Sequence, residues 1–141
     1  MQFPASAHED LIVTWLIAGP NSTISHESAL AFYELSDVLP AEVHIIVPRT
    51  ASHWRANIRQ HTNQLAPDEI TRRGGLQVTT VARTIADVAS RGLAEEQVCQ
   101  ALQEALERGL VSQEELLTQA ERRGGRAKKI ILSAIQKEVE K

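Results

Sequence analysis

Apolar residues recur with a helical period at the start of the chain. From residue 8 to residue 18 they are spaced by three and four positions, and Gly19-Pro20 ends the run. This helix is predicted to place one apolar face in the core: Leu11, Ile12, Trp15 and Leu16. Ser25 can cap a second, shorter helix that fades near residue 36. The pattern therefore predicts two N-terminal helices.

Alternation replaces the helical period in the middle of the chain. Apolar and polar residues alternate from residue 42 to residue 47, and Pro48 ends the run. A second extended segment covers residues 58–65, and residues 76–79 are a third strand or an extended lead-in. Because the first two segments are close in the chain, we expect them to pair as a hairpin in a small two- or three-stranded antiparallel sheet.

The helical period returns after the third extended segment and continues to the end. Successive apolar faces are separated by Gly92, Gly109 and Gly124-Gly125, each placed where a helix can end. Ser112 followed by Glu115 has the spacing of a capping box. We therefore expect a C-terminal bundle of about four helices and an α+β fold class.

Composition favours one soluble domain. Hydrophobic residues make up 43% and charged residues 23% of the 141 residues, which is ordinary for a globular protein, so we expect a single domain with sub-lobes 1–92 and 93–141. The longest apolar run is short and lacks a preceding basic segment, so neither a signal peptide nor a membrane span is predicted. Cys99 is the only cysteine, which suits a reducing compartment, and we expect a cytoplasmic protein.

Charge is unevenly distributed along the chain. The formal net charge is -3, yet the segment from Glu42 to Arg83 carries six arginines against three acidic residues. This cationic middle suggests an anionic partner. The candidate partner-binding or nucleic-acid-binding surface within it is Arg49, His53, Trp54, Arg55, Arg59 and His61.

Two interpretations of this surface remain open. Guanidinium groups beside an indole suit phosphate contacts and base stacking, or an acidic patch on a protein. Alternatively, the segment is a solvated hairpin loop with Trp54 folded onto the core. The acidic helix predicted at residues 95–107 is a second surface that could meet a partner.

A helical stripe after the third extended segment is a further candidate site, formed by Thr80, Arg83, Thr84 and Asp87. Arg83 and Asp87 are four positions apart and can form an ion pair along the helix. The favoured interpretation is a threonine cap and a structural ion pair. An exposed stripe would instead be a place where a partner docks.

Catalytic and metal chemistry are not predicted. His26, Glu27 and Ser28 are consecutive, and neighbours on a helix point to different sides. A metal site at His44, His53 and His61 is disfavoured, since no carboxylate-bearing metal motif accompanies these histidines. We therefore expect no catalytic residues, no metal and no cofactor.

A winged helix is the main structural rival, because two helices and a hairpin follow one another from residue 8 to residue 65. Its recognition helix would carry Glu27, Glu34 and Asp37 and no basic residue. These charges would repel the phosphate backbone.

Four segments together resemble AbiEi-family antitoxins, in order and spacing. They are Ile24–Leu30 (ISHESAL), Val43–Pro48 (VHIIVP), Gln77–Asp87 (QVTTVARTIAD) and Ala101–Val111 (ALQEALERGLV). The resemblance extends from about His8 to Ile135.

The resemblance implies the C-terminal, toxin-neutralising domain of a type IV antitoxin. In that family an N-terminal winged helix-turn-helix binds operator DNA, and members are described as transcriptional regulators in abortive infection and phage defence. Since the residues before His8 are too few for such a domain, we expect a fragment, a shortened member, or a partner that supplies it. The expected function is non-enzymatic neutralisation of a nucleotidyltransferase-like toxin. The alternative is a nucleic-acid-binding regulator that uses the arginine-rich hairpin.

Overall fold

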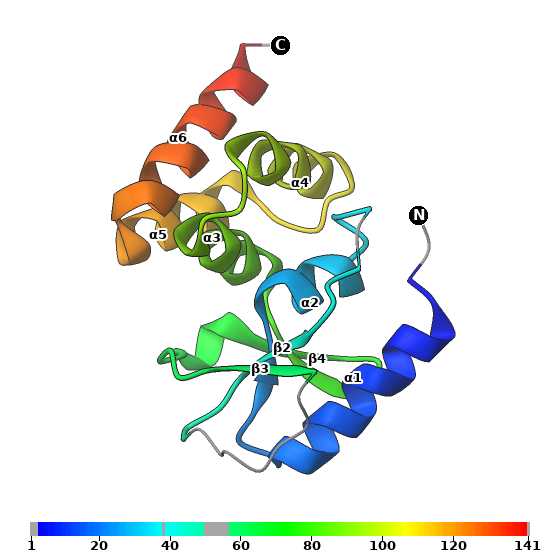
Figure 1. Ribbon diagram of the computed structural model, residues 1–141. Coiled ribbons are helices and arrows are strands. Elements are labelled where there is room, and N and C mark those ends of the chain that lie inside the picture. The colour runs from blue at the N-terminus through cyan, green and yellow to red at the C-terminus, as the bar shows by residue number, and fades with distance from the viewer. Residues whose placement is uncertain (1–2, 38, 50–56, 141) are drawn as a thin grey trace. The chain divides into compact units, whose positions relative to one another are not determined.

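The computed structural model describes residues 3–37, 39–49 and 57–140 and confirms an α+β fold (Figure 1). It divides into two compact units, Met1–Thr80 and Val81–Lys141. The first unit contains the sheet and the second contains only helices among its described residues. No helix in the described part of the chain combines the length and apolarity needed to span a membrane.

The first unit is built on a five-stranded mixed sheet in the order β3-β2-β1-β5-β4. Helix α1 contacts strands β1, β2 and β5, and helix α2 contacts β2. The elements are α1 (Ala5–Ala18), β1 (Thr23–Ile24), α2 (His26–Phe32), β2 (Val43–Ile46), β3 (Ile58–His61), the 3-10 turn η1 (Pro67–Glu69), β4 (Ile70–Arg73) and β5 (Leu76–Thr79).

The predicted hairpin of the first two long strands is wrong. Strands β2 and β3 pair in parallel, with Val43 opposite Ile58 and Ile46 opposite His61. The other edge of β2 pairs antiparallel with β1, which the sequence pattern did not reveal. A parallel pair cannot form a wing of two antiparallel strands, so the winged-helix rival is also wrong for this region.

The antiparallel hairpin lies instead at the other end of the sheet, where β4 and β5 pair. Gly74 and Gly75 form its turn, both with positive φ. The left-handed backbone at Gly74 favours glycine, and a Cβ atom there would also displace the His8 ring, from which it would lie 2.8 Å. The core beneath consists of aliphatic side chains with no exposed surface, such as Ile24, Ile45 and Val78.

The second unit contains the four helices that the apolar period predicts: α3 (Val81–Arg91), α4 (Glu95–Glu107), α5 (Gln113–Arg123) and α6 (Gly125–Val139). Helix α6 contacts the other three. The predicted capping box is confirmed, because the Glu115 amide donates to Ser112 Oγ at 3.1 Å and the Ser112 amide donates to Glu115 Oε1 at 3.0 Å. Ile85, Leu102, Leu116 and Ile131 are fully buried, and each contributes about 1.5–3 kcal/mol of hydrophobic stabilisation.

Candidate functional site

The arginine-bearing surface predicted from the sequence is only partly described. Arg49 follows β2 and Arg59 lies on β3, and both are exposed. Strand β3 is at one edge of the sheet, so Arg59 is presented at an open edge of the described structure. His53, Trp54 and Arg55 lie outside the described residues. Whether these three join Arg59 in one surface stays a prediction.

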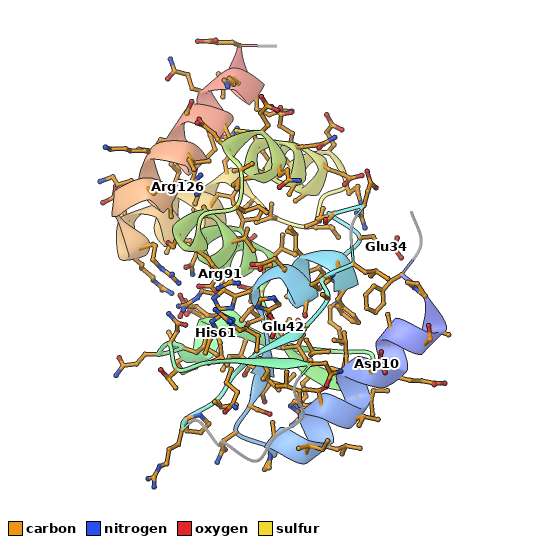
Figure 2. The ribbon with its side chains drawn as sticks, in the orientation of Figure 1. Asp10, Glu34, Glu42, His61, Arg91 and Arg126 are labelled. Atoms are coloured by element: carbon orange, nitrogen blue, oxygen red, sulfur yellow. The ribbon has the colours of Figure 1, made fainter. Side chains whose placement is uncertain are left out.

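His61, the last residue of the predicted surface, belongs to a cluster of three imidazoles. Its ring stacks on His26 with centroids 3.8 Å apart and on His44 with centroids 5.3 Å apart. His26 and His44 are buried, and His61 is half-buried. Figure 2 labels His61 at the sheet of the first unit. The histidine cluster therefore joins α2, β2 and β3, three elements far apart in sequence.

A chain of polar contacts runs from a carboxylate through two of these rings. Glu27 Oε2 lies 3.3 Å from His44 Nε2, and His44 Nδ1 lies 3.0 Å from His61 Nε2. A hydrogen bond between two ring nitrogens needs one proton, so at most one of the two facing nitrogens carries hydrogen. With His44 Nε2 donating to Glu27, His61 Nε2 donates to His44 Nδ1. This arrangement orients all three side chains.

The cluster depends on an unusual start of α2. His26 has a φ of 53°, a left-handed conformation that only a few per cent of non-glycine residues adopt. Ser25 occupies the N-cap position, but its hydroxyl contacts His26 Nδ1 at 2.7 Å and makes no capping hydrogen bond. The expectation that Ser25 caps the helix through its side chain is therefore wrong. The residue with this backbone conformation is the one whose ring stacks on His61.

Contacts around the histidine cluster join α2 to β2, the strand beside the edge strand β3. The Ser28 hydroxyl accepts a hydrogen bond from the His44 amide at 2.8 Å, which ties β2 to α2 a second time. Within residues 3–37, 39–49 and 57–140, no three His, Cys, Asp or Glu side chains are placed to hold a metal ion. The sequence pattern gives no sign that His26 lies beside His44 and His61, which it brings together only in the disfavoured metal site.

The second predicted site is largely buried. Thr80 ends the first unit and is half-buried, whereas Arg83, Thr84 and Asp87 on α3 are 6%, 0% and 1% exposed. Arg83 Nε donates to Asp87 Oδ1 at 2.9 Å, and Arg123 of α5 also donates to that oxygen. These contacts match the structural interpretation of an ion pair rather than an exposed docking stripe.

Burial dominates the electrostatics of Asp87. Removal from water raises the pKa of its carboxyl, and the charges of Arg83 and Arg123 oppose that rise. The charges of the two arginines therefore offset only part of the free-energy cost of removing this carboxylate from water. This ion pair lies within the helical unit, where it joins α3 to α5.

An apolar surface stripe on α1 was not predicted. Leu16 was expected in the core, yet it is 67% exposed, and Ile17 and Val13 beside it are 43% and 37% exposed. Helix α1 contacts the sheet through its other side, where Leu11 is buried and Trp15 Nε1 donates to the Ser22 carbonyl at 2.9 Å. The helix is apolar on both sides, and only one side can face the sheet.

No family model matches the chain, and no curated protein is significantly similar to it. The three features above, the open β3 edge, the histidine cluster and the apolar stripe of α1, are therefore the basis for assigning a function.

Proposed function

We propose that this chain is a non-enzymatic regulatory domain that binds and neutralises a partner toxin in the bacterial cytoplasm. The resemblance to AbiEi-family antitoxins suggests a toxin of the nucleotidyltransferase type, in a toxin-antitoxin or phage-defence system. One observation carries the proposal of protein binding, which is the exposed apolar stripe Val13, Leu16 and Ile17 on α1.

The stripe has the character of a docking surface. Its three residues are spaced by three and four positions, so their side chains are contiguous on one face of the helix. Contiguous apolar surface of this kind marks protein interaction sites, whereas isolated exposed leucines do not. Covering a leucine side chain contributes about 1.5–3 kcal/mol at most. A stripe of three such residues is therefore a suitable centre for an interface.

Polar groups lie around this centre in the way that interfaces require. Glu9 and Asp10, one to two turns before the stripe on the same helix, are exposed and form an acidic rim. The exposed edge strand β3 with Arg59 is a second surface that a partner could extend by adding a strand. The histidine cluster supports this role because it keeps β3 in register with β2 before any partner arrives.

Co-expression with the product of the adjacent gene tests the proposal. The wild-type chain is expected to relieve toxicity and to recover the toxin in a pull-down. Leu16→Glu places a charge at the centre of the stripe and is expected to weaken the complex by at least roughly tenfold. The matched control is Leu117→Glu on α5, where the leucine is 40% exposed and the complex should be unchanged.

Two results would contradict the proposal. One is failure of the wild-type chain to bind the toxin or to relieve its toxicity. The other is equal binding by the Leu16→Glu and Leu117→Glu variants, with circular dichroism showing that both are folded.

A nucleic-acid-binding regulator is the second candidate, supported by the exposed guanidinium groups of Arg49 and Arg59 on the β3 side of the sheet. Binding of this kind would weaken steeply with salt, and Arg59→Ala would reduce it. Binding that does not respond to salt would remove this candidate.

A further inference from the structure

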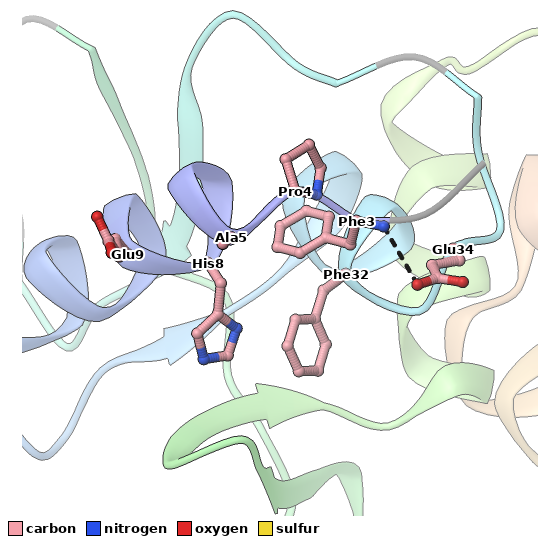
Figure 3. A pocket seen from close by; sticks show the side chains of 7 residues that line it. All are labelled: Phe3, Pro4, Ala5, His8, Glu9, Phe32 and Glu34. Carbon is pink, nitrogen blue, oxygen red and sulfur yellow. Dashed lines mark hydrogen bonds between the residues drawn. The ribbon is translucent and has the colours of Figure 1, made fainter.

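A hollow lined by aromatic and acidic side chains lies in the first unit, where the N-terminal end of α1 meets the C-terminal end of α2 (Figure 3). It is open to solvent, and its volume of about 820 Å³ exceeds that of any single side chain. The lining residues are Phe3, Pro4, Ala5, His8, Glu9, Phe32 and Glu34.

Three rings form the aromatic part of the hollow. Phe32 is central, with Phe3 edge-on to it at 5.8 Å and an interplanar angle of 80°. The His8 ring stacks on Phe32, with centroids 5.9 Å apart and an interplanar angle of 25°. All three residues are half-buried, and all three line the hollow. A cation can bind over the accessible face of an aromatic ring, so a cluster of this kind is a suitable wall for a cationic ligand.

The rings are held in place by the sheet below them. His8 Nε2 lies 3.2 Å from the Gly74 carbonyl oxygen, which can only accept, so this nitrogen carries the proton. The position that a Gly74 Cβ would occupy lies 3.6 Å from Phe32 Cζ. The β4–β5 turn therefore supports both rings. The hollow exists before any ligand binds.

Two acidic residues, Glu9 and Glu34, line the hollow. The carboxylates of Glu9 and Glu34 are exposed, and Glu34 Oε1 accepts a hydrogen bond from the Phe3 amide at 3.2 Å (Figure 3). The N-terminus of α1 contributes roughly half a positive charge nearby. The Glu34 carboxylate lies beside Phe3, whereas the Glu9 carboxylate lies farther from the rings (Figure 3). Among the described residues that line the hollow, none is lysine or arginine.

We propose that this hollow binds a cationic side chain, arginine or lysine, of the partner protein. The aliphatic stem packs on Phe32 and Phe3, and the charged end lies beside Glu34. That the cation belongs to a partner toxin rests on the proposed function, whereas the binding of a cation in the hollow does not. The hollow lies at the N-terminal end of α1, and the apolar stripe lies farther along the same helix, so one partner can cover the stripe and place a basic residue here.

Nuclear magnetic resonance of the full chain tests the inference without a partner. The probes are N-acetyl-arginine amide and its neutral isostere N-acetyl-citrulline amide, with the corresponding lysine and norleucine amides as a second pair. Saturable shifts of the Phe3, His8 and Phe32 ring signals are expected with both cations. The neutral probes should bind at least roughly tenfold more weakly, as expected from the loss of charge and cation–π attraction.

Glu34→Gln and Phe32→Leu should each reduce the response to the arginine probe, while Glu114→Gln on the exposed surface of α5 should leave it unchanged. Equal shifts with the arginine and citrulline probes, or an unaltered response of Glu34→Gln, would overturn the inference. Failure to bind a toxin would contradict the proposed function and leave these titrations unaffected. Loss of the titration with an intact toxin complex would contradict only the inference.

Discussion

The two units bury different kinds of polar side chain. The helical unit buries charge, because Asp87 is enclosed with Arg83 and Arg123. The sheet unit buries one carboxylate, Glu69, which accepts a hydrogen bond from the Ala66 amide, but no arginine is among its described buried residues. Its other buried titratable groups can remain neutral, namely the imidazoles of His26 and His44 and the phenol of Tyr33. A buried ion pair depends on both partners being present, whereas a neutral cluster depends on each proton being correctly placed. Different kinds of substitution should therefore destabilise the two units.

Removing one member of the ion pair should give the largest effect. Asp87→Ala leaves the buried Arg83 without its carboxylate and is expected to lower the free energy of unfolding by about 3–5 kcal/mol. Urea denaturation followed by circular dichroism measures the loss. The control in the same unit is Glu121→Ala, since Glu121 pairs with Lys128 in solvent and should contribute less than about 1 kcal/mol. Equal losses of unfolding free energy in Asp87→Ala and Glu121→Ala would contradict this difference between the buried and the exposed ion pair.

Breaking the histidine cluster should give an intermediate effect that is confined to the sheet unit. His44→Leu removes the partner of both Glu27 and His61, at an expected cost of about 1–3 kcal/mol. Hydrogen exchange of the Val47 amide, which donates to the His61 carbonyl at 2.8 Å, should accelerate. Exchange of the amides in α3 should change little. Faster exchange in both units, or in neither, would show that the cluster does not hold β3 locally.

Removing the hydroxyl of Tyr33 should have the smallest effect on the free energy of unfolding at neutral pH. At alkaline pH, ionisation of the same hydroxyl should lower the stability of the wild-type chain. Its hydroxyl donates to the Thr79 carbonyl at 2.7 Å, so Tyr33→Phe should cost about 1 kcal/mol. Burial raises the pKa of Tyr33 to about 12, and Arg73 nearby opposes the rise. Because the folded pKa lies above the ordinary value of 10, this stabilisation is complete below pH 10 and is lost as the pH approaches 12.

Comparison of wild type with Tyr33→Phe isolates this response from other alkaline titrations. The wild-type chain should lose more stability than the variant between pH 10 and about 12. Tyr33 is the only tyrosine, so phenolate absorbance reports its ionisation directly. Ionisation of Tyr33 in the folded chain near pH 10 would contradict the role of burial.

The helical unit could be predicted from sequence because its signals are local. Capping residues and terminal glycines lie within a few positions of the apolar faces that they delimit, as Ser112 and Gly124 do for α5. The Arg83–Asp87 pair was found for the same reason, since four positions on a helix bring two side chains together. Arg123 could not be found in this way, because the packing of α5 on α3 brings it to Asp87.

The sheet unit was harder to predict because its contacts are distant in sequence. Strand β1 has two residues, too few for an alternating pattern, and its insertion beside β2 could not be foreseen. The histidine cluster needs the parallel register of β2 and β3 and the positive φ of His26, neither of which has a sequence pattern. Leu16 was misplaced because α1 is apolar on two sides, and periodicity alone does not tell which side faces the sheet.

The position of β1 in the sheet also bears on how the chain folds during synthesis. One edge of β1 pairs with β2, which is close to it in the sequence. The other edge pairs with β5, where Ile24 lies opposite Val78, and β5 is synthesised much later. Until the ribosome has released the β5 segment, β1 keeps an unpaired apolar edge that can pair with another chain. Closing so long a loop is slow compared with forming helices. The interval before β5 emerges is therefore a stage at which pairing with another chain competes with folding, and the helices that follow can form quickly once the sheet has closed.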